Sequence, residues 1–255
     1  MGSALAEGLL RAAWCAPADL DIVESSAEQR AALSRSLPSL RVDANLDVSR
    51  VDSATGAVVA VKPGDAPAAL RMIGDAGVSR VLSIVAGLAT TRIEGLFTGP
   101  VAVIRAMPNT PILVGRGASA IAGGAHVTAA DLEWAESILG AVGVVVRLSE
   151  SSLDAVTGLS GSMPAYLYLV VEALIDAGVH QGLSRDVSRQ LVVSTFAGSA
   201  AMLASGESPE ELRAQVTSPG GTTAAGLRML EARAVRSAFL EAVAAAAERS
   251  RQLGR

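Results

Sequence analysis

The stretch AVVAVKPGDAPAALRMIGDAGVSRVLSIVAG, residues 57–87, decides the fold. Its two ends, 57–62 and 80–86, are short runs rich in β-branched residues and apolar along nearly their whole length. Between them lie a Pro-Gly-Asp turn and a helical segment at 67–76. Strands without a polar face are typical of parallel sheets that helices cover on both sides. The stretch therefore predicts a strand–helix–strand unit of an α/β protein.

The same alternation continues on both sides of this stretch. Further strands are predicted at 20–24, 101–107 and 143–148, and helices at 26–36, 90–97 and 128–139. Right-handed crossovers between parallel strands give an open, doubly wound sheet, which binds ligands beyond the carboxyl ends of its strands. We predict a doubly wound α/β domain over residues 1–148, with its ligand site at that edge.

From residue 149 onward the pattern is helical. Helices are predicted at 151–157, 163–182, 184–205, 208–216, 222–231 and 234–252. The segment Leu167–Ile175 is apolar on every face except at Glu172, and a bundle of this size offers little interior in which to bury such a helix. We expect residues 149–255 to form a helical domain that packs against a second subunit. The alternative is a helix sandwiched between the two domains.

The composition excludes several classes of function. The chain has 255 residues, a net charge of −4 and 3% aromatic residues, so it lacks the basic face and the stacking platforms of nucleic-acid-binding proteins. Cys15 is the only cysteine, and His126 and His180 lie far apart without a metal-ligand spacing. We expect no metal centre and no nucleic-acid partner.

The N-terminus, MGSALAE, lacks the basic region and uninterrupted apolar core of a signal peptide. The most apolar run of helical length, 163–179, contains Pro164, Glu172 and Asp176 and is too short to span a bilayer. We therefore expect a cytoplasmic protein with no membrane partner.

Small residues follow three of the predicted strands, in AVKP at 60–63, SIVAG at 83–87 and MPNTP at 107–111. Small side chains at a sheet edge let a flat ring lie against backbone, and Asn109 can supply a hydrogen bond. The alternative is that these are ordinary turns that end strands. Lys62 is the only lysine, but nothing in the sequence indicates the burial that Schiff-base chemistry needs, so we expect a positioning role at most.

The most informative segment is VTSPGGTTA, residues 216–224. Ser-Pro-Gly-Gly breaks the chain, and Thr222 and Thr223 then open a helix. The first turn of a helix has unpaired N–H groups and the positive end of the helix dipole, which suit a carboxylate. The alternative is an ordinary threonine N-cap. A second Ser/Gly segment, 158–166, also precedes a helix and has the same alternative.

Taken together, these segments resemble the pyrroline-5-carboxylate reductase family over essentially the whole chain. The resemblance rests on AVKP, SIVAG, MPNTP, GLSGSMPAY at 158–166 and VTSPGGTTAAGL at 216–227, the last being highly specific. It implies an NAD(P)H-binding Rossmann-like domain followed by a helical dimerisation domain, in a homodimer or higher homo-oligomer. It also implies hydride transfer from the nicotinamide to 1-pyrroline-5-carboxylate, giving L-proline.

The resemblance assigns roles to individual residues. The implied cofactor contacts are Asn45, Ala60, Val61, Lys62, Pro63, Ser83, Ile84, Val85 and Ala86, to which we add Asn109 from its place after a strand. The implied substrate contacts are Ser218, Gly220, Gly221, Thr222 and Thr223. Thr223 corresponds to the threonine whose hydroxyl bonds the substrate's ring nitrogen, and it is the candidate catalytic residue.

Two features depart from the family pattern. Family members begin with an apolar strand and a glycine-rich turn, whereas this chain begins at MGSA, with Gly2 in place of the third glycine of that turn. We expect an N-terminally truncated chain that lacks a central strand, and weak cofactor affinity if the chain is truly this short. The second departure is Met163, where the family has glycine; its side chain would crowd the turn if the backbone needed a positive φ.

The cofactor is expected to be NADPH, with NADH possible. Glu24 stands where an acidic residue would hold a ribose diol, whereas Ser25, Ser26 and Arg30 could bind a 2′-phosphate. Two other functions remain open. One is a non-catalytic dimeric paralogue that has lost cofactor binding. The other is a β-hydroxyacid-type dehydrogenase, which typically needs a lysine in the helical domain, and this helical domain has none.

Overall fold

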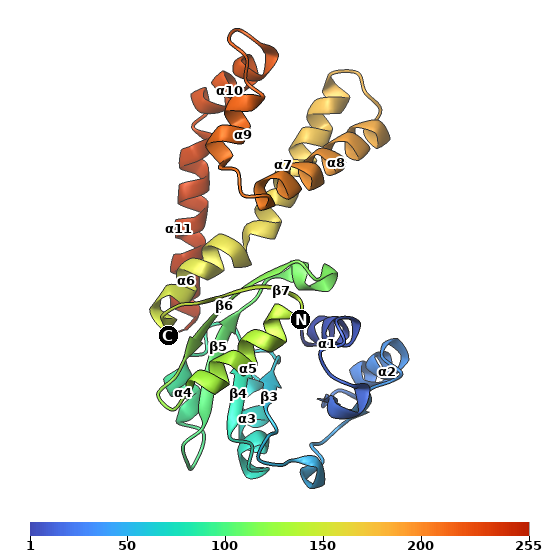
Figure 1. The fold of residues 1–255 in the computed structure, drawn as a ribbon, viewed down its shortest axis with the longest axis vertical. Helices are drawn as coiled ribbons and strands as arrows, with labels where there is room; N and C mark the ends of the chain where they lie inside the picture. The colour runs from blue at the N-terminus through green and yellow to red at the C-terminus, as the bar shows by residue number, and fades with distance from the viewer. Residues whose placement is uncertain (255) are drawn as a thin grey trace. The chain divides into compact units, whose positions relative to one another are not determined.

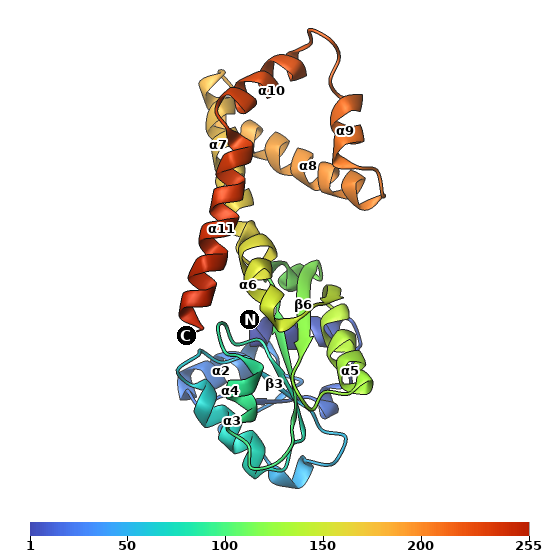
Figure 2. The ribbon, with the colours of Figure 1, turned by 90° about the vertical axis from the view of Figure 1, so that its left-hand side faces the viewer.

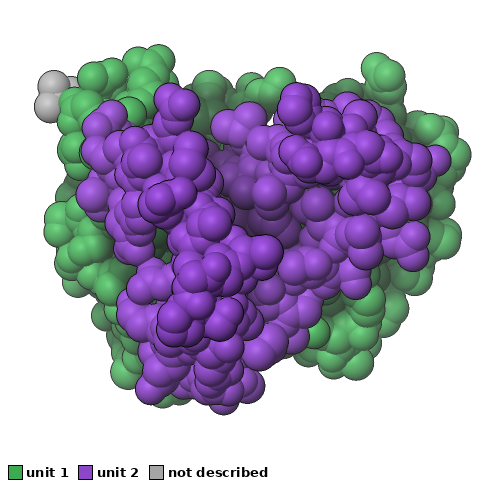
Figure 3. All heavy atoms as spheres, turned by 90° about the horizontal axis from the view of Figure 1, so that it is seen from above, with its two compact units in different colours: residues 1–162, 244–255 green, residues 163–243 purple. Residues whose placement is uncertain are grey.

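The computed structural model describes residues 1–254 and divides into two compact units. The first unit comprises residues 1–162 together with the chain from residue 244 onward, and the second comprises residues 163–243 (Figure 3). The helical segment 149–162 therefore folds with the first unit. The domain division after residue 148 stays a prediction, and each unit is described by itself.

The first unit contains a five-stranded sheet in the order β3-β4-β5-β6-β7 (Figure 1). Its strands are β3 (Ala57–Val59), β4 (Arg80–Ser83), β5 (Ala102–Met107), β6 (Gly117–Gly123) and β7 (Gly143–Arg147). Neighbouring strands are parallel except for β5 and β6, which are antiparallel. The predicted α/β fold is therefore confirmed, with a mixed sheet because β6 runs antiparallel to β5. Strand β6, GASAIAG, was missed because glycine, alanine and serine are poor strand formers.

A second sheet pairs β1 (Asp21–Val23) with β2 (Arg41–Asp43) in parallel, separately from the first sheet. Helix α1 (Gly2–Arg11) contacts the cores beside both sheets. Its Leu5 and Leu9 join the core of the five-stranded sheet, whereas its Ala6 packs with Leu37 and Leu40. The doubly wound sheet, predicted to lack a central strand, is thus observed as two sheets, and α1 contacts the core beside each of them.

Helices cover both faces of the five-stranded sheet (Figures 1 and 2). Helices α3 (Ala66–Asp75) and α4 (Thr90–Glu94) contribute to one apolar cluster, and α1 and α5 (Ala129–Gly140) contribute to the other. Leu82, Ile104 and Ile121 are completely buried in the second cluster. Helix α2 (Ala27–Ser36) lies beside β2. The central strands β4 and β5 are thus buried along nearly their whole length, as the sequence predicted.

The chain leaves β7 through short helical turns that still belong to the first unit. These are η4 (Glu150–Ser152), α6 (Leu153–Val156) and the π-helical turn η5 (Thr157–Gly161). Leu153 of α6 packs on Ala120 and Ala122 of β6. Short π-helical turns occur frequently at functional sites, so this turn helps to locate the site.

The second unit is helical. It comprises α7 (Met163–His180), α8 (Arg185–Ala204), α9 (Pro209–Gln215), α10 (Thr222–Ala232) and the first part of α11 (Val235–Leu253). Among its residues only Ile175 and Ser188 are buried. Helices α7 and α8 approach closely where Gly178 meets Ser188. By length and composition alone, the helical run 150–180 could cross a membrane. Few of its residues are buried.

Candidate active site

Three loops leave the carboxyl ends of the parallel strands β3, β4 and β5 at one edge of the sheet. After β3 the chain forms an exposed turn from Val61 to Pro63. Ser83 ends β4 fully buried, and its hydroxyl accepts a hydrogen bond from the Val85 N–H at 3.4 Å. The Ile84 N–H donates to the Val59 carbonyl at 3.0 Å. The structure thus places the predicted segments 60–63 and 83–86 beside each other.

The first turn of α1 lies against the end of β3. A Cβ atom on Gly2 would come within 2.9 Å of the Ala60 Cβ, so only glycine fits this approach. The helix has no capping side chain, and the amides of Ser3 and Ala4 have no partner in the described part of the chain. An unpaired first turn packed this closely on a strand end can hold a phosphate of a dinucleotide. The residues therefore fit the cofactor that the sequence predicted.

The carboxyl end of β1 carries the residues predicted to distinguish the two nicotinamide cofactors. The Arg30 guanidinium donates to the carbonyls of Glu24 at 2.8 Å and Ser25 at 2.7 Å. The Glu24 carboxylate accepts from the Ser26 N–H at 2.8 Å, and the Ser26 hydroxyl caps α2. Ser25 and Asn45 are exposed at this edge. The side chains of Arg30 and Ser26 thus already form hydrogen bonds with backbone groups of this chain.

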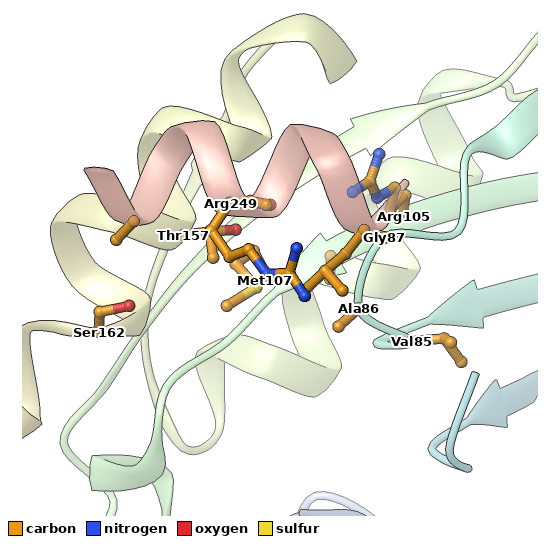
Figure 4. Close-up of a pocket in the computed structure, with 12 residues that line it drawn as sticks. Val85, Ala86, Gly87, Arg105, Met107, Thr157, Ser162 and Arg249 are labelled. Carbon is orange, nitrogen blue, oxygen red and sulfur yellow. The ribbon is translucent and has the colours of Figure 1, made fainter. Parts of the chain in front are cut away.

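A cavity of roughly 240 Å³ lies beside the ends of β4 and β5 (Figure 4). It is lined by Val85, Ala86, Gly87, Arg105, Ala106, Met107, Thr157, Ser162, Ala246, Arg249, Ser250 and Leu253. Figure 4 shows the Arg249 side chain reaching between Met107 and Ala86. Of these residues only Val85 and Ala86 were candidate site residues from the sequence. Nothing in the sequence pattern connects the end of α11 with the ends of these strands.

The cavity's second arginine is neutralised by a carboxylate. Arg105 forms an ion pair with Glu150 at 3.1 Å, and the N–H and hydroxyl of Thr90 donate to the same carboxylate at 2.8 and 2.6 Å. Burial raises the pKa of Glu150, but the hydrogen bonds from Thr90 and Arg105 outweigh it and hold the pKa below its ordinary value. The ion pair and these hydrogen bonds connect Glu150 to Arg105 of β5 and Thr90 of α4.

Asn109 joins the loop after β5 to two other segments. Its side-chain amide donates to the Ser160 carbonyl at 3.1 Å, and its oxygen accepts from the Ala118 N–H at 2.9 Å. The side chain is buried, so it serves as a positioning group for the π-helical turn and β6. The hydrogen bond between Asn109 and a cofactor, which the sequence analysis predicted, stays a prediction. Met163 begins α7 in ordinary helical backbone, so the predicted crowding of a positive-φ turn does not arise.

The predicted substrate turn belongs to the second unit. Gly220 has φ +70°, which favours glycine, and the Gly221 N–H donates to the Ser218 carbonyl at 3.0 Å. Gly221 is the N-cap of α10 and supplies no capping side chain. The amides of Thr222 and Thr223 therefore have no partner in the described residues, and both side chains are exposed. This turn offers free donors for a small carboxylate instead of the ordinary threonine N-cap.

Comparisons with known proteins agree with this arrangement. Residues 150–253 match the family model described as pyrroline-5-carboxylate reductase dimerisation. The pyrroline-5-carboxylate reductase of Corynebacterium melassecola is 40% identical over 261 residues, covering 100% of this chain and 96% of that protein. The enzyme of the same name from Mycobacterium tuberculosis is 42% identical over 279 residues, covering 99% and 93%.

Solved structures give the same result. The Plasmodium falciparum pyrroline carboxylate reductase with NADP bound aligns with a TM-score of 0.85 and 32% identity, covering 100% of this chain and 95% of that one. The pyrroline-5-carboxylate reductase of Coxiella burnetii aligns with a TM-score of 0.86 and 29% identity, covering 99% and 96%.

Proposed function

The chain belongs to the pyrroline-5-carboxylate reductase family, and on that premise we propose that it reduces the C=N bond of 1-pyrroline-5-carboxylate to L-proline with NAD(P)H. The observation that carries the proposal is the open first turn of α10, with its unpaired amides and exposed threonines. A protein that had lost its activity would have no need for such a turn. A retained turn therefore favours the reductase over a non-catalytic paralogue.

The proposed cofactor is NADPH, which supplies the hydride when bound; NADP is bound in the Plasmodium relative. Gly2 and Ala60 would let its pyrophosphate approach the first turn of α1. The proposed remaining contacts are Ser25, Ser26, Asn45, Val61, Lys62, Pro63, Ser83, Ile84, Val85, Ala86 and Asn109. Comparing kcat/KM for NADPH and NADH tests the preference, because Glu24 favours a ribose diol whereas an exposed Ser25 favours a phosphate.

The proposed substrate site is the turn of residues 218–223. The substrate carboxylate accepts hydrogen bonds from the amides of Thr222 and Thr223, while the Thr223 hydroxyl bonds the ring nitrogen. A cyclic imine is basic enough to react as its iminium ion, so no histidine or carboxylic acid is needed to protonate it. Fixing both ends of a small ring aims its C=N carbon, and this orientation accounts for much of the rate gain.

Replacing Thr223 by valine tests this role, because valine keeps the shape of threonine and lacks its hydroxyl. We expect kcat/KM for pyrroline carboxylate to fall about 10- to 100-fold, the worth of one hydrogen bond in a site. Thr222→Val is the matched control, since Thr222 acts through its backbone N–H, and its kcat/KM should stay within about threefold. An unchanged kcat/KM in Thr223→Val would remove Thr223 from the mechanism.

The proposal includes assembly of a homodimer or higher homo-oligomer through the C-terminal helices. Exposed apolar side chains on α7, α8, α10 and α11 support it, as does the match of residues 150–253 to a dimerisation family. Such an interface accounts for the apolar run 150–180 without a membrane, in keeping with a cytoplasmic enzyme. Light scattering tests the assembly directly, and a monomer at micromolar concentration would contradict it.

A further inference from the structure

Strand β7 is the last strand of the five-stranded sheet, and β6 is its only strand partner among the described residues. The Gly117 N–H donates to the Val142 carbonyl at 2.8 Å, and the Leu148 N–H donates to the Ile121 carbonyl at 2.9 Å. Backbone groups alternate in direction along a strand. Residues 144 and 146 therefore bond to β6, while the N–H and C=O groups of Gly143, Val145 and Arg147 face outward and have no partner within residues 1–254.

This edge has little of the usual protection against pairing with another chain. Val144, Val146 and Leu148 share one face of β7 and are 67%, 51% and 42% exposed. On the other face, Val145 packs against the core cluster that contains α5 residues. Edge strands are normally blunted by proline, charged side chains or a bulge. Strand β7 has no proline or bulge, and its one charged side chain, Arg147, pairs with Glu136. An apolar edge of this kind calls for a specific partner.

The apolar row of β7 continues into a segment that belongs to the dimerisation family model. Val144 and Val146 pair in register with Ala118 and Ala120 of β6. On that same face Ala120 packs against Leu153 of α6, which lies inside the matched residues 150–253. The exposed row is thus a direct neighbour of a dimerisation segment. A second copy of this chain is the partner that this continuity indicates.

The sequence of β7 is also complementary to itself in the antiparallel direction. With Val145 opposite its own copy, Gly143 lies opposite Arg147, and Val144 lies opposite Val146. Each outward residue then exchanges two hydrogen bonds with the residue facing it. The two Arg147 side chains are four residues apart along the pair, about 14 Å, which exceeds the Debye length of about 8 Å. Because Gly143 has no side chain, it leaves room for the Arg147 guanidinium of the other copy, which lies opposite it.

We infer that β7 pairs antiparallel with β7 of a second copy, about a two-fold axis at Val145, so that two sheets join into one. Strands of five residues bury less than the 1,200 Å² or so of a stable interface. The pairing therefore rests on the proposed assembly through the helices and adds to it. It extends the contact between copies to the first unit.

Disulfide trapping tests the register. In the Cys15→Ala background, Val144→Cys and Val146→Cys together place facing cysteines about 4.5 Å apart between Cα atoms, within disulfide range. We expect mild oxidation to convert the double variant largely to a covalent dimer. Each single variant is the matched control, because the introduced cysteines of the two copies then lie diagonally across the strand pair, about 7–8 Å apart. Absence of the covalent dimer in the folded double variant, or equal cross-linking of a single variant, would overturn the inference.

Hydrogen exchange separates this inference from the proposed assembly. In the oligomer, the amides of Val145 and Arg147 should exchange at least about 100-fold more slowly than free edge amides. Val145→Pro removes an amide that β6 does not use and should return Arg147 to fast exchange. An oligomer with fast exchange and no cross-link leaves the assembly intact and refutes β7 pairing. Slow exchange without the cross-link would mean that another segment covers the edge, which also refutes it.

Discussion

The two units of the chain differ in how far their apolar side chains are buried. In the first unit, an apolar cluster lies on each face of the five-stranded sheet, and residues such as Leu82 and Ile104 are completely buried. In the second unit only Ile175 and Ser188 are buried, while apolar side chains such as Leu169 and Leu240 are exposed. The first unit has the core of an independent fold. The second has helices whose apolar surface needs a second copy.

In the second unit, folding therefore depends on assembly. Helices in globular proteins gain most of their stability from packing an apolar face. When that face packs on another chain, stability depends on protein concentration. The proposed substrate turn at the start of α10 belongs to this unit, so we expect its geometry to depend on assembly as well. The following substitutions test the comparison in order of their expected effect.

The largest effect is expected from Leu169→Asp on α7. Leu169 is 66% exposed in the single chain, and a carboxylate there would be buried without a partner in the oligomer. We expect the assembly to dissociate at micromolar concentration and reductase activity to fall more than about 100-fold. Light scattering and an NADPH oxidation assay measure both effects.

Val48→Asp in the first unit is the matched control, because Val48 is similarly exposed, at 59%. We expect it to leave mass and activity unchanged. If Leu169→Asp behaved in the same way, the apolar surface of α7 would not be an interface, and the contrast between the units would lose its meaning.

The second effect concerns the core of the first unit. Ile104 is completely buried in β5, so Ile104→Ala leaves a cavity and should lower the free energy of unfolding by about 2–5 kcal/mol. Ile104→Val removes one methylene group and should cost only about 0.5–1.5 kcal/mol. Urea unfolding measures both values. Because the first unit has its own core, the loss should not vary with protein concentration, and a strong concentration dependence would contradict this independence.

Much of the first unit could be predicted from its strands. The runs at 57–62, 80–86 and 101–107 are apolar and β-branched, and each became a strand. Strands β2 and β6 escaped prediction because RVD is too short and polar and GASAIAG has little strand preference. The antiparallel direction of β6 is set by how the chain returns to the sheet, which residue types do not encode.

Parts of the candidate site could be predicted where backbone conformation has a sequence signature. The break at SPGG and the helix start at Thr222 follow from the sequence, whereas the choice of Gly221 over a threonine as N-cap does not. The cavity residues Arg105 and Arg249 were missed because they come from a strand interior and a C-terminal helix, 144 positions apart (249 − 105). Only folding brings them together. The buried amide of Asn109 was likewise beyond sequence reasoning, since its partners at Ser160 and Ala118 are set by tertiary structure.

A smaller effect is expected at Glu150, where the matched dimerisation segment joins the first unit. Hydrogen bonds from Thr90 and Arg105 hold the pKa of Glu150 below its ordinary value despite the opposing effect of burial. Its contribution to stability is therefore complete above the unfolded pKa of about 4.3 and is lost as pH falls through the lower folded value. Glu150→Gln should cost about 1 kcal/mol at neutral pH and lose part of this acid sensitivity.

Urea unfolding at pH 7 and at pH 3 checks this prediction. The difference between wild type and Glu150→Gln should shrink at the lower pH, because the wild-type carboxylate is then increasingly protonated. Glu133→Gln on α5 is the control for removing an exposed carboxylate elsewhere in the unit. A difference that stays constant with pH would show that the ion pair with Arg105 does not stabilise the junction.

The smallest effect compares two capping boxes, one in each unit. Thr128 and Asp131 cap α5, and Ser208 and Glu211 cap α9 with the same reciprocal hydrogen bonds. Helix α5 packs in the core, so Thr128→Ala should lower the free energy of global unfolding by about 1 kcal/mol. Helix α9 has no buried residue, so Ser208→Ala should speed hydrogen exchange within α9 alone and leave global unfolding unchanged. If Ser208→Ala lowered global stability as much as Thr128→Ala does, α9 would be part of a closed core, and the two units would be alike after all.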